Sequence, residues 1–244
     1  MHGGIIVFQI CMVLLICFFA SFLQGTTGFG FGLVSMAFLP LLLPFKSSIV
    51  ISSIVSAIIA AQVAYKYRKY IKLKIVIIPT IVSLITSSIG VALVLTMNLS
   101  IIKSLLGWVL ISLSIYFFVT RKKNIYIKTN VLNGIIIGSI TGIVTGMFNI
   151  GGPFLALYFF YGTKEPLEYK GTLSLNFAIT STWTSLIHLY FGGFQNEYLS
   201  LVVIGIIGGV IATVLSHHLF KNINRDLLGI LTYILVAVMG VLLI

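Results

Sequence analysis

GMFNIGGP, residues 146–153, interrupts a long apolar run and decides the fold of the second half of the chain. The apolar segment after it, Pro153 to Thr163, has 11 residues, which measure about 16 Å as an α-helix. The hydrocarbon core of a bilayer is about 30 Å thick, so a helix of this length cannot cross it. The sequence therefore predicts a re-entrant hairpin, in which a helix enters the membrane, breaks at Asn149–Gly152 and returns as a half-helix that begins at Pro153.

The composition places the chain in a membrane. Of its 244 residues, 59% are apolar and 8% are charged, whereas soluble proteins have about 45–50% and about 25%. These values exclude a soluble globular enzyme and predict an all-α, polytopic membrane protein. The apolar runs lie at about residues 5–23, 29–45, 48–65, 75–97, 99–119, 131–148, 153–161, 171–191, 199–217 and 227–244.

Basic residues predict the orientation in the membrane. Clusters lie at residues 66–74 and 121–128, and loops rich in lysine and arginine face the cytoplasm. Two apolar spans, 75–97 and 99–119, lie between the clusters. If both clusters are cytoplasmic, the turn at Asn98 that connects these spans is on the outside. Lys164 and Lys170 also fall on the cytoplasmic side, so the chain must return to that side after the second cluster, as the hairpin requires. The net charge of +11 is therefore assigned to cytoplasmic loops and not to nucleic-acid binding.

The first half of the chain has a similar arrangement. GTTGFG at residues 25–30 interrupts an apolar run, and Pro40 and Pro44 limit the following helix to about 11 residues. The sequence therefore predicts a second hairpin of the same kind.

A shift of 121 residues, half the chain length, aligns the two halves and places Gly25 on Gly146 and Gly30 on Gly151. Each half is expected to contain a re-entrant hairpin and three transmembrane helices. Because three is an odd number of crossings, the second half is inverted relative to the first, as in many secondary transporters. The predicted repeats are residues 1–120 and 121–244.

The same shift aligns Cys17 with Gly138 and Ser21 with Gly142, two glycines of a stripe in the second half. Glycines at every fourth position allow close packing of membrane helices. Cys17 is therefore interpreted as a small packing residue. The stripe consists of Gly134, Gly138, Gly142 and Gly146.

The two breaks form the candidate site. Irregular backbone within the membrane must be buried in protein or line a wet cavity, since its unpaired polar groups are costly in lipid. A helix begins at Gly28–Gly32 and another at Gly151–Pro153, and helix N-termini bind anions through free N–H groups and the positive dipole end. Glycines let the backbone approach a ligand, and neutral polar side chains lie nearby. The candidate substrate-binding residues are Gln24, Gly25, Thr26, Thr27, Gly28, Gly30, Asn149, Gly151, Gly152, Pro153 and Asn176.

Alternative interpretations of these residues stay open. The glycine-rich breaks can serve only to let helices cross closely. Asn176, which aligns near Ser52, can form an interhelical hydrogen bond instead of contacting a ligand. His188 lies toward the outer end of its span and is interpreted as a satisfied or water-facing histidine, with a proton-coupling site as the alternative.

The sequence contains no recognisable enzyme centre. The apolar core has no carboxylate pair, no HExxH motif and no Ser/His/Asp set, and neither Cys11 nor Cys17 has an evident base. We therefore predict no catalytic residue, no metal site and no cofactor, and the lack of a P-loop excludes primary transport by this chain alone. The expected partners are a small anion and the lipid bilayer, and the pattern favours no particular oligomeric state.

The paired elements GTTGFGFG (25–32) and GMFNIGGP (146–153) resemble the duplicated glycine motif of the TauE/SafE sulfite exporter family, also called the TSUP family. The resemblance extends over the whole chain and includes a Ser/Thr-rich segment, GTLSLN, at residues 171–176. It implies export of sulfite, organosulfonates or related sulfur anions across a bacterial plasma membrane. Import, transport of another anion such as a carboxylate, and a structural role in the membrane are the alternatives.

Overall fold

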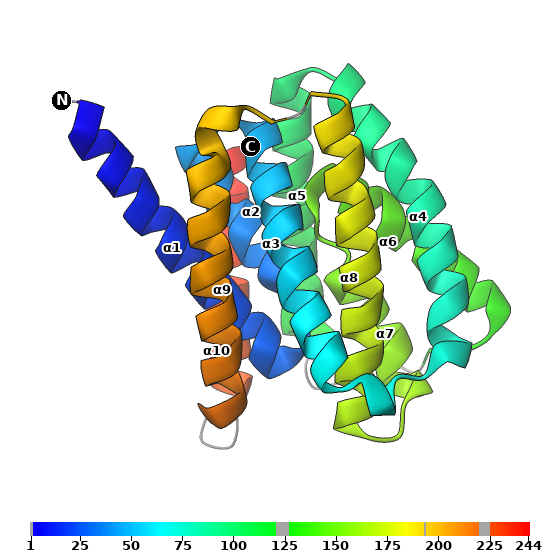
Figure 1. Ribbon diagram of the computed structural model, residues 1–244. Helices are drawn as coiled ribbons and strands as arrows, with labels where there is room; N and C mark the ends of the chain where they lie inside the picture. Colours follow the sequence, from blue (N-terminus) through cyan, green and yellow to red (C-terminus); the bar gives the residue numbers. More distant parts are fainter. Residues whose placement is uncertain (1, 121–126, 193, 220–224) are drawn as a thin grey trace.

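The computed structural model describes residues 2–120, 127–192, 194–219 and 225–244, which form a bundle of helices (Figure 1). The helices in chain order are α1 (His2–Thr27), α2 (Phe31–Leu42), α3 (Phe45–Lys66), the 3-10 turn η1 (Arg68–Tyr70), α4 (Leu73–Thr96), α5 (Leu99–Thr120), α6 (Val131–Phe148), α7 (Gly152–Gly162), α8 (Pro166–Tyr190), the 3-10 turn η2 (Asn196–Tyr198), α9 (Leu199–Leu219) and α10 (Arg225–Leu243). The prediction of an all-α fold is confirmed over these residues.

Six of the described helices, namely α1, α3, α4, α5, α6 and α9, contain a stretch long and apolar enough to cross a membrane. The protein is therefore a multi-pass membrane protein, as predicted. Helix α8 has 25 residues, but serine, threonine and asparagine interrupt its apolar character. A helix of this kind is not stable against lipid, so it requires the interior of the bundle.

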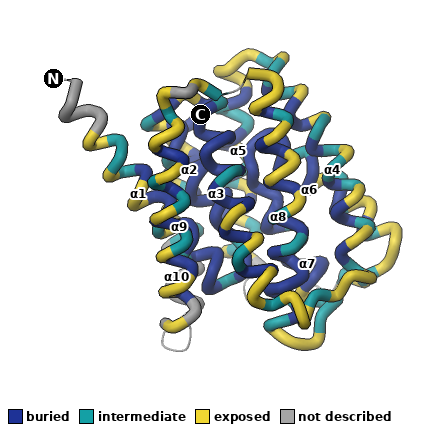
Figure 2. The backbone as a smooth tube through the Cα atoms, in the orientation of Figure 1, coloured by how far each residue is buried: buried dark blue, intermediate teal, exposed yellow. Residues whose placement is uncertain are grey.

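Helices α3 and α8 pack against each other in the middle of the bundle. The apolar window of α3 is 78% buried, compared with 33–44% for the corresponding windows of the other five spanning helices. Figure 2 shows α3 and α8 flanked by helices with exposed outer faces. The two central helices therefore bring their serines and threonines together away from lipid, where hydrogen bonds between them can form.

The glycine stripe of α6 packs closely against α4, as predicted. A Cβ atom at Gly142 would lie 2.6 Å from the Ser83 carbonyl oxygen, and one at Gly138 would lie 2.8 Å from the Pro79 carbonyl oxygen. The hydroxyl of Ser83 donates to the carbonyl oxygen of Gly138 at 2.9 Å. These contacts leave no room for a side chain at Gly138 or Gly142.

Helix α1 packs against α9 through small residues in a similar way. A Cβ atom at Gly205 would lie 3.1 Å from Cys17 Sγ, and one at Gly209 would lie 2.9 Å from Ser21 Oγ. Cys17 is fully buried, which fits the packing role predicted for it. The remaining outer pair consists of α5 and α10.

The break in the second half lies where the sequence predicts it. Helix α6 ends at Phe148, and α7 begins at Gly152 and has 11 residues. Asn149, between them, has a left-handed backbone with φ of 56°, a conformation that asparagine tolerates better than most residues.

The break in the first half begins later than predicted. Gly25 does not interrupt α1, which continues to Thr27, and the break comprises Gly28, Phe29 and Gly30. Gly28 and Gly30 have φ values of 92° and 110°, which only glycine adopts at low cost. Gly25 lies within α1 and faces α9. Because it has no side chain, α1 can pack directly against Ser216 of α9, and this contact stabilises the helix at Gly25.

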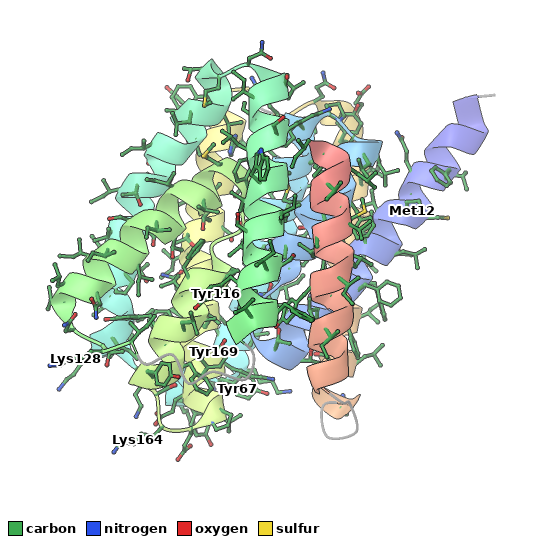
Figure 3. All side chains as sticks on the ribbon, turned by 180° about the vertical axis from the view of Figure 1, so that it is seen from behind. Met12, Tyr67, Tyr116, Lys128, Lys164 and Tyr169 are labelled. Carbon is green, nitrogen blue, oxygen red and sulfur yellow. The ribbon has the colours of Figure 1, made fainter. Side chains whose placement is uncertain are left out.

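Several charged residues lie at one end of the bundle (Figure 3). The α3–α4 and α7–α8 connections lie at the lower end in Figure 1, where Figure 3 shows Lys128 and Lys164. Lys72 and Glu168 form an ion pair of 2.6 Å that joins the α3–α4 connection to the first turn of α8. Lys170, near the same end, lies in α8 and is only 6% exposed. Residues 121–126, which hold most of the second basic cluster and the predicted repeat boundary, lie outside the described residues.

Candidate functional site

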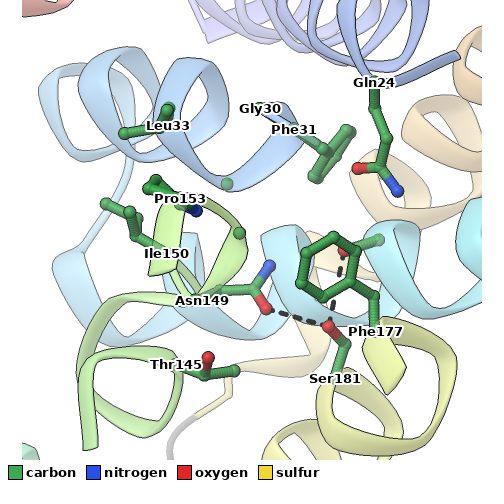
Figure 4. Close-up of a pocket in the computed structure, with 14 residues that line it drawn as sticks. Gln24, Gly30, Phe31, Leu33, Thr145, Asn149, Ile150, Pro153, Phe177 and Ser181 are labelled. Carbon is green, nitrogen blue, oxygen red and sulfur yellow. Dashed lines mark hydrogen bonds between the residues drawn. The ribbon is translucent and has the colours of Figure 1, made fainter. Parts of the chain in front are cut away.

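The two helix breaks meet at a cavity of about 20 Å³ in the interior of the bundle (Figure 4). A space of this size holds one or two water molecules. The lining residues come from both breaks and from the central helices α3 and α8. They are Gln24, Gly30, Phe31, Gly32, Leu33, Ser56, Thr145, Asn149, Ile150, Gly151, Gly152, Pro153, Phe177 and Ser181.

Asn149 connects the second break to both central helices. Its Nδ2 donates to Ser52 Oγ of α3 at 2.9 Å, and its Oδ1 accepts from Ser181 Oγ of α8 at 3.1 Å. Ser52 is also 2.7 Å from Ser35 Oγ of α2. Because Asn149 is 6% exposed, these bonds satisfy an amide that would otherwise be costly to bury. The bonds join the second break to three helices, α2, α3 and α8.

Helix N-termini approach the cavity from both breaks. The N-cap residues of α2 and α7 are Gly30 and Gly151, and neither helix has a side-chain cap. The N–H groups in the first turn of each helix therefore lack the partner that a capping side chain supplies, and in α7 Pro153 contributes no N–H. A Cβ atom at Gly32 would overlap the carbonyl oxygen of Asn149, so the two breaks are in backbone contact.

Two buried hydrogen-bond donors at the cavity have no partner. Gln24 Nε2 and Thr145 Oγ1 are both without a hydrogen bond, and the two residues are 3% and 2% exposed. Figure 4 shows Gln24 reaching in from one side and Thr145 from the other. Leaving such a group unsatisfied costs about 1–3 kcal/mol, so each calls for a reason.

Gly25 follows Gln24 in the chain, and Gly146 follows Thr145. A side chain of α8 contacts the carbonyl oxygen of each of these two glycines. Lys170 Nζ donates to the carbonyl oxygen of Gly25 at 2.9 Å, and His188 Nε2 lies 3.1 Å from that of Gly146. These carbonyls belong to the last turns of α1 and α6, whose C-terminal ends carry partial negative charge. A basic side chain is a favourable partner there.

The structure brings six of the eleven predicted site residues to the cavity, namely Gln24, Gly30, Asn149, Gly151, Gly152 and Pro153. The others lie outside its lining. The Thr26 and Thr27 hydroxyls bond to the carbonyl oxygen of Leu23 in their own helix, at 2.8 and 2.9 Å.

The remaining predicted residues contact other helices. Gly25 contacts α9, and Gly28 packs near Tyr169 of α8. Asn176 Nδ2 donates to Thr80 Oγ1 of α4 at 2.8 Å, which is the interhelical hydrogen bond considered as its alternative role.

Sequence reasoning missed Thr145, Ser56, Ser181 and Gly32. The signal for Thr145 was present, since the 121-residue shift that pairs Gly25 with Gly146 also pairs Gln24 with Thr145. No comparable signal separates Ser181 from the many other hydroxyl residues of α8.

The lining offers neutral donors and free N–H groups but no carboxylate. Among the described residues, no three histidine, cysteine, aspartate or glutamate side chains are grouped to hold a metal ion. Donors without a nearby negative charge form an environment for an anion.

A model of the sulfite exporter TauE/SafE family matches residues 13–243, nearly the whole chain. The chain belongs to the TauE/SafE family. The family assignment agrees with the resemblance of the two glycine motifs and makes the protein a membrane transporter of the sulfite exporter type. No curated protein and no solved structure matches the chain. The TauE/SafE assignment therefore rests on the match over residues 13–243.

Proposed function

We propose that this TauE/SafE protein is a secondary transporter that exports a small sulfur oxyanion, sulfite or an organosulfonate, through the cavity between its two helix breaks. The observation that carries the proposal is the pair of unpartnered donors, Gln24 Nε2 and Thr145 Oγ1, beside two uncapped helix N-termini. An oxyanion supplies acceptors for all of these donors at once.

The packing role of the glycines does not account for these donors. Glycines explain why helices approach closely, but close packing alone favours apolar side chains where Gln24 and Thr145 lie. Buried groups with unmet hydrogen bonds that converge on one cavity are typical of a ligand site. The empty cavity is smaller than an anion of four heavy atoms, so binding requires the breaks to move apart, as expected of a transporter that alternates between states.

The contacts of the helices support an inverted-repeat architecture with repeats 1–120 and 121–244. Residues 17, 21 and 25 of α1 face α9, and their equivalents after the 121-residue shift, 138, 142 and 146 of α6, face α4. The last-turn hydrogen bonds match as well: Gly28 N donates to the oxygen of Gln24, and Asn149 N to that of Thr145, both at 2.7 Å. In this architecture α2 and α7 are the return arms of two re-entrant hairpins.

We place loops 66–74 and 121–128 in the cytoplasm of a bacterial cell because they are rich in lysine and arginine. The lower end of Figure 1, where the α3–α4 and α7–α8 connections lie, then faces the cytoplasm. We expect cysteines introduced at Tyr70, Asn130 and Lys164 to react with a membrane-impermeant thiol reagent from the cytoplasmic side only. A cysteine at Asn98 should react from outside only. All four parent residues are exposed, and the background should lack Cys11 and Cys17. Reaction of positions 130 and 164 from opposite faces would contradict the inverted repeat.

The anion site is tested with Thr145→Val. In the empty protein the Thr145 hydroxyl has no partner, so its removal should leave the melting temperature unchanged or raised. Its loss should weaken anion binding by about tenfold or more, because a hydrogen bond to a charged group contributes about 1.5–3 kcal/mol. The measurement is titration of the purified protein with sulfite, ethanesulfonate and acetate, which also tests the carboxylate alternative.

Thr141→Val is the matched control for this experiment. Thr141 lies one turn earlier on α6, is fully buried and also has an unpartnered hydroxyl, but it does not line the cavity. The control should show the same stability change and unaltered anion affinity. Equal affinities for parent, Thr145→Val and Thr141→Val proteins would reject the proposed site.

A further inference from the structure

His188 and Lys170 occupy related places on either side of the cavity. Gly25 and Gly146, whose carbonyl oxygens they bind, are equivalent in the two halves. The two side chains are 18 residues apart on α8, about 27 Å along a helix. Histidine is the side chain whose charge ordinarily changes in the physiological range of pH. The two halves therefore present different basic side chains at equivalent carbonyls, and the one beside Gly146 is a histidine.

The hydrogen bonds of His188 define its neutral form. A carbonyl oxygen only accepts, so Nε2 carries the hydrogen that is donated to Gly146. Nδ1 is then a bare acceptor, and it is buried without a partner in a side chain that is 0% exposed. Adding a proton at Nδ1 creates a buried cation that needs a negative charge nearby.

The helices packed around His188 bring no carboxylate to its end of α8 among the described residues: Glu197, in η2 beyond the end of α8, is exposed, and η1, which packs near the other end of α8, holds Arg68, Lys69 and Tyr70. Lys46, in the first turn of α3, is the charged side chain that interacts with it electrostatically, and it is a cation. Helix α6 has no ionisable residue, and Lys74, the one ionisable residue of α4, lies in its first turn at the lower end. The other ionisable residues of α3, α7 and α8 are Tyr65, Lys66, Tyr158, Tyr161, Glu168, Tyr169, Lys170 and Tyr190. Of these, only the exposed Tyr190 is at the same end of α8 as His188.

We propose that His188 is a proton-binding site coupled to the anion site, so that the anion and a proton on Nδ1 bind together. The inference rests on the proposed function, since the anion in the cavity supplies the missing negative charge. Gly146 lies beside Thr145 and three residues before Asn149, so the imidazole also holds the end of α6 that forms the site. His188 is therefore a positioning residue whose charge responds to occupancy.

The coupling is large enough to measure. His188 is seven residues from Ser181 at the cavity, which is about 10 Å along α8. Opposite unit charges at this separation, at an effective dielectric constant of about 20, change a binding constant by about tenfold. By reciprocity, the anion strengthens proton binding by the same factor.

The test is calorimetric titration of the purified full chain with ethanesulfonate between about pH 8 and pH 5.5. Ethanesulfonate is chosen because it stays ionised over this range, whereas sulfite takes up a proton itself. We expect binding to become about tenfold tighter toward low pH. Titrations in two buffers of different ionisation enthalpy should show proton uptake on binding by the parent protein.

His188→Gln keeps a donor for Gly146 but cannot titrate, so it should bind with little pH dependence and without proton uptake. His218→Gln is the matched control, because His218 is an exposed histidine whose Nδ1 lies 2.9 Å from the carbonyl oxygen of Val214 in its own helix, away from the cavity. It should behave as the parent. Parent binding that is independent of pH or takes up no proton would overturn the proposal, as would unchanged coupling in His188→Gln. Absence of ethanesulfonate and sulfite binding at every pH would instead reject the proposed function, and this inference with it.

Discussion

Replacing Asn149 with aspartate is expected to lower anion efflux from proteoliposomes by at least about 100-fold. The substitution keeps the size of the side chain and tolerates the left-handed backbone of this position. It places a carboxylate at the cavity, a few ångströms from the bound anion. Like charges about 4 Å apart repel by about 4 kcal/mol at an effective dielectric constant of 20, which exceeds a hundredfold in a binding constant.

Asn149→Gly separates the effect of charge from the loss of the amide. Glycine adopts the positive φ without strain and removes the bonds to Ser52 and Ser181. We expect it to reduce efflux less than aspartate does, with the melting temperatures of both purified variants recorded in parallel. An aspartate variant that is folded and transports sulfite as fast as the parent would show that the anion does not pass this residue.

Gly32→Ala is expected to bring efflux close to background and to lower the melting temperature markedly. The added methyl group would overlap the Asn149 carbonyl oxygen and lie 2.9 Å from its carbonyl carbon. These are backbone atoms, which cannot rotate away as a side chain can. The whole of α2 must therefore move away from the second break to make room for the methyl group. Overpacking of this kind costs about 1–3 kcal/mol or more, and the separation also takes apart the site that the two breaks share.

Gly134→Ala is the control for the Gly32 variant. A methyl group there would meet the Tyr158 hydroxyl at 3.0 Å and Ile78 Cγ2 at 3.4 Å, which are side-chain atoms at wider distances than the backbone contact at Gly32. Alanine also favours a helix interior over glycine by about 1 kcal/mol. The control should retain stability and transport. If Gly32→Ala behaves in the same way, the two breaks are not in the contact described above.

Local patterns in the sequence were sufficient for the membrane class, for most helix boundaries and for the second break. These features depend on local composition and on residues with restricted backbones, such as Asn149 and Pro153. The first break was placed three residues too early at Gly25. A glycine inside a helix costs only about 1 kcal/mol, and contact with Ser216 of α9 offsets a cost of this size. The sequence alone does not reveal that contact.

The tertiary structure decided which polar residues share the cavity. Helical periodicity assigns residues to faces of a helix only when an apolar face contrasts with a polar one. Helix α8 is buried on most of its surface and has hydroxyl residues on several faces, so nothing local distinguishes Ser181 at the cavity from Asn176 at Thr80. The choice depends on which helix packs against each face.

The sequence by itself therefore determined that the chain is helical, lies in a membrane and has paired glycine breaks, because these properties follow from composition and from short-range backbone preferences. Only the tertiary structure decided that Gln24 and Thr145 point into one cavity and that Lys170 and His188 bind the carbonyls beside them. Each of these relations joins residues more than 40 positions apart in the chain. Their proximity follows from the packing of whole helices, which no local pattern encodes.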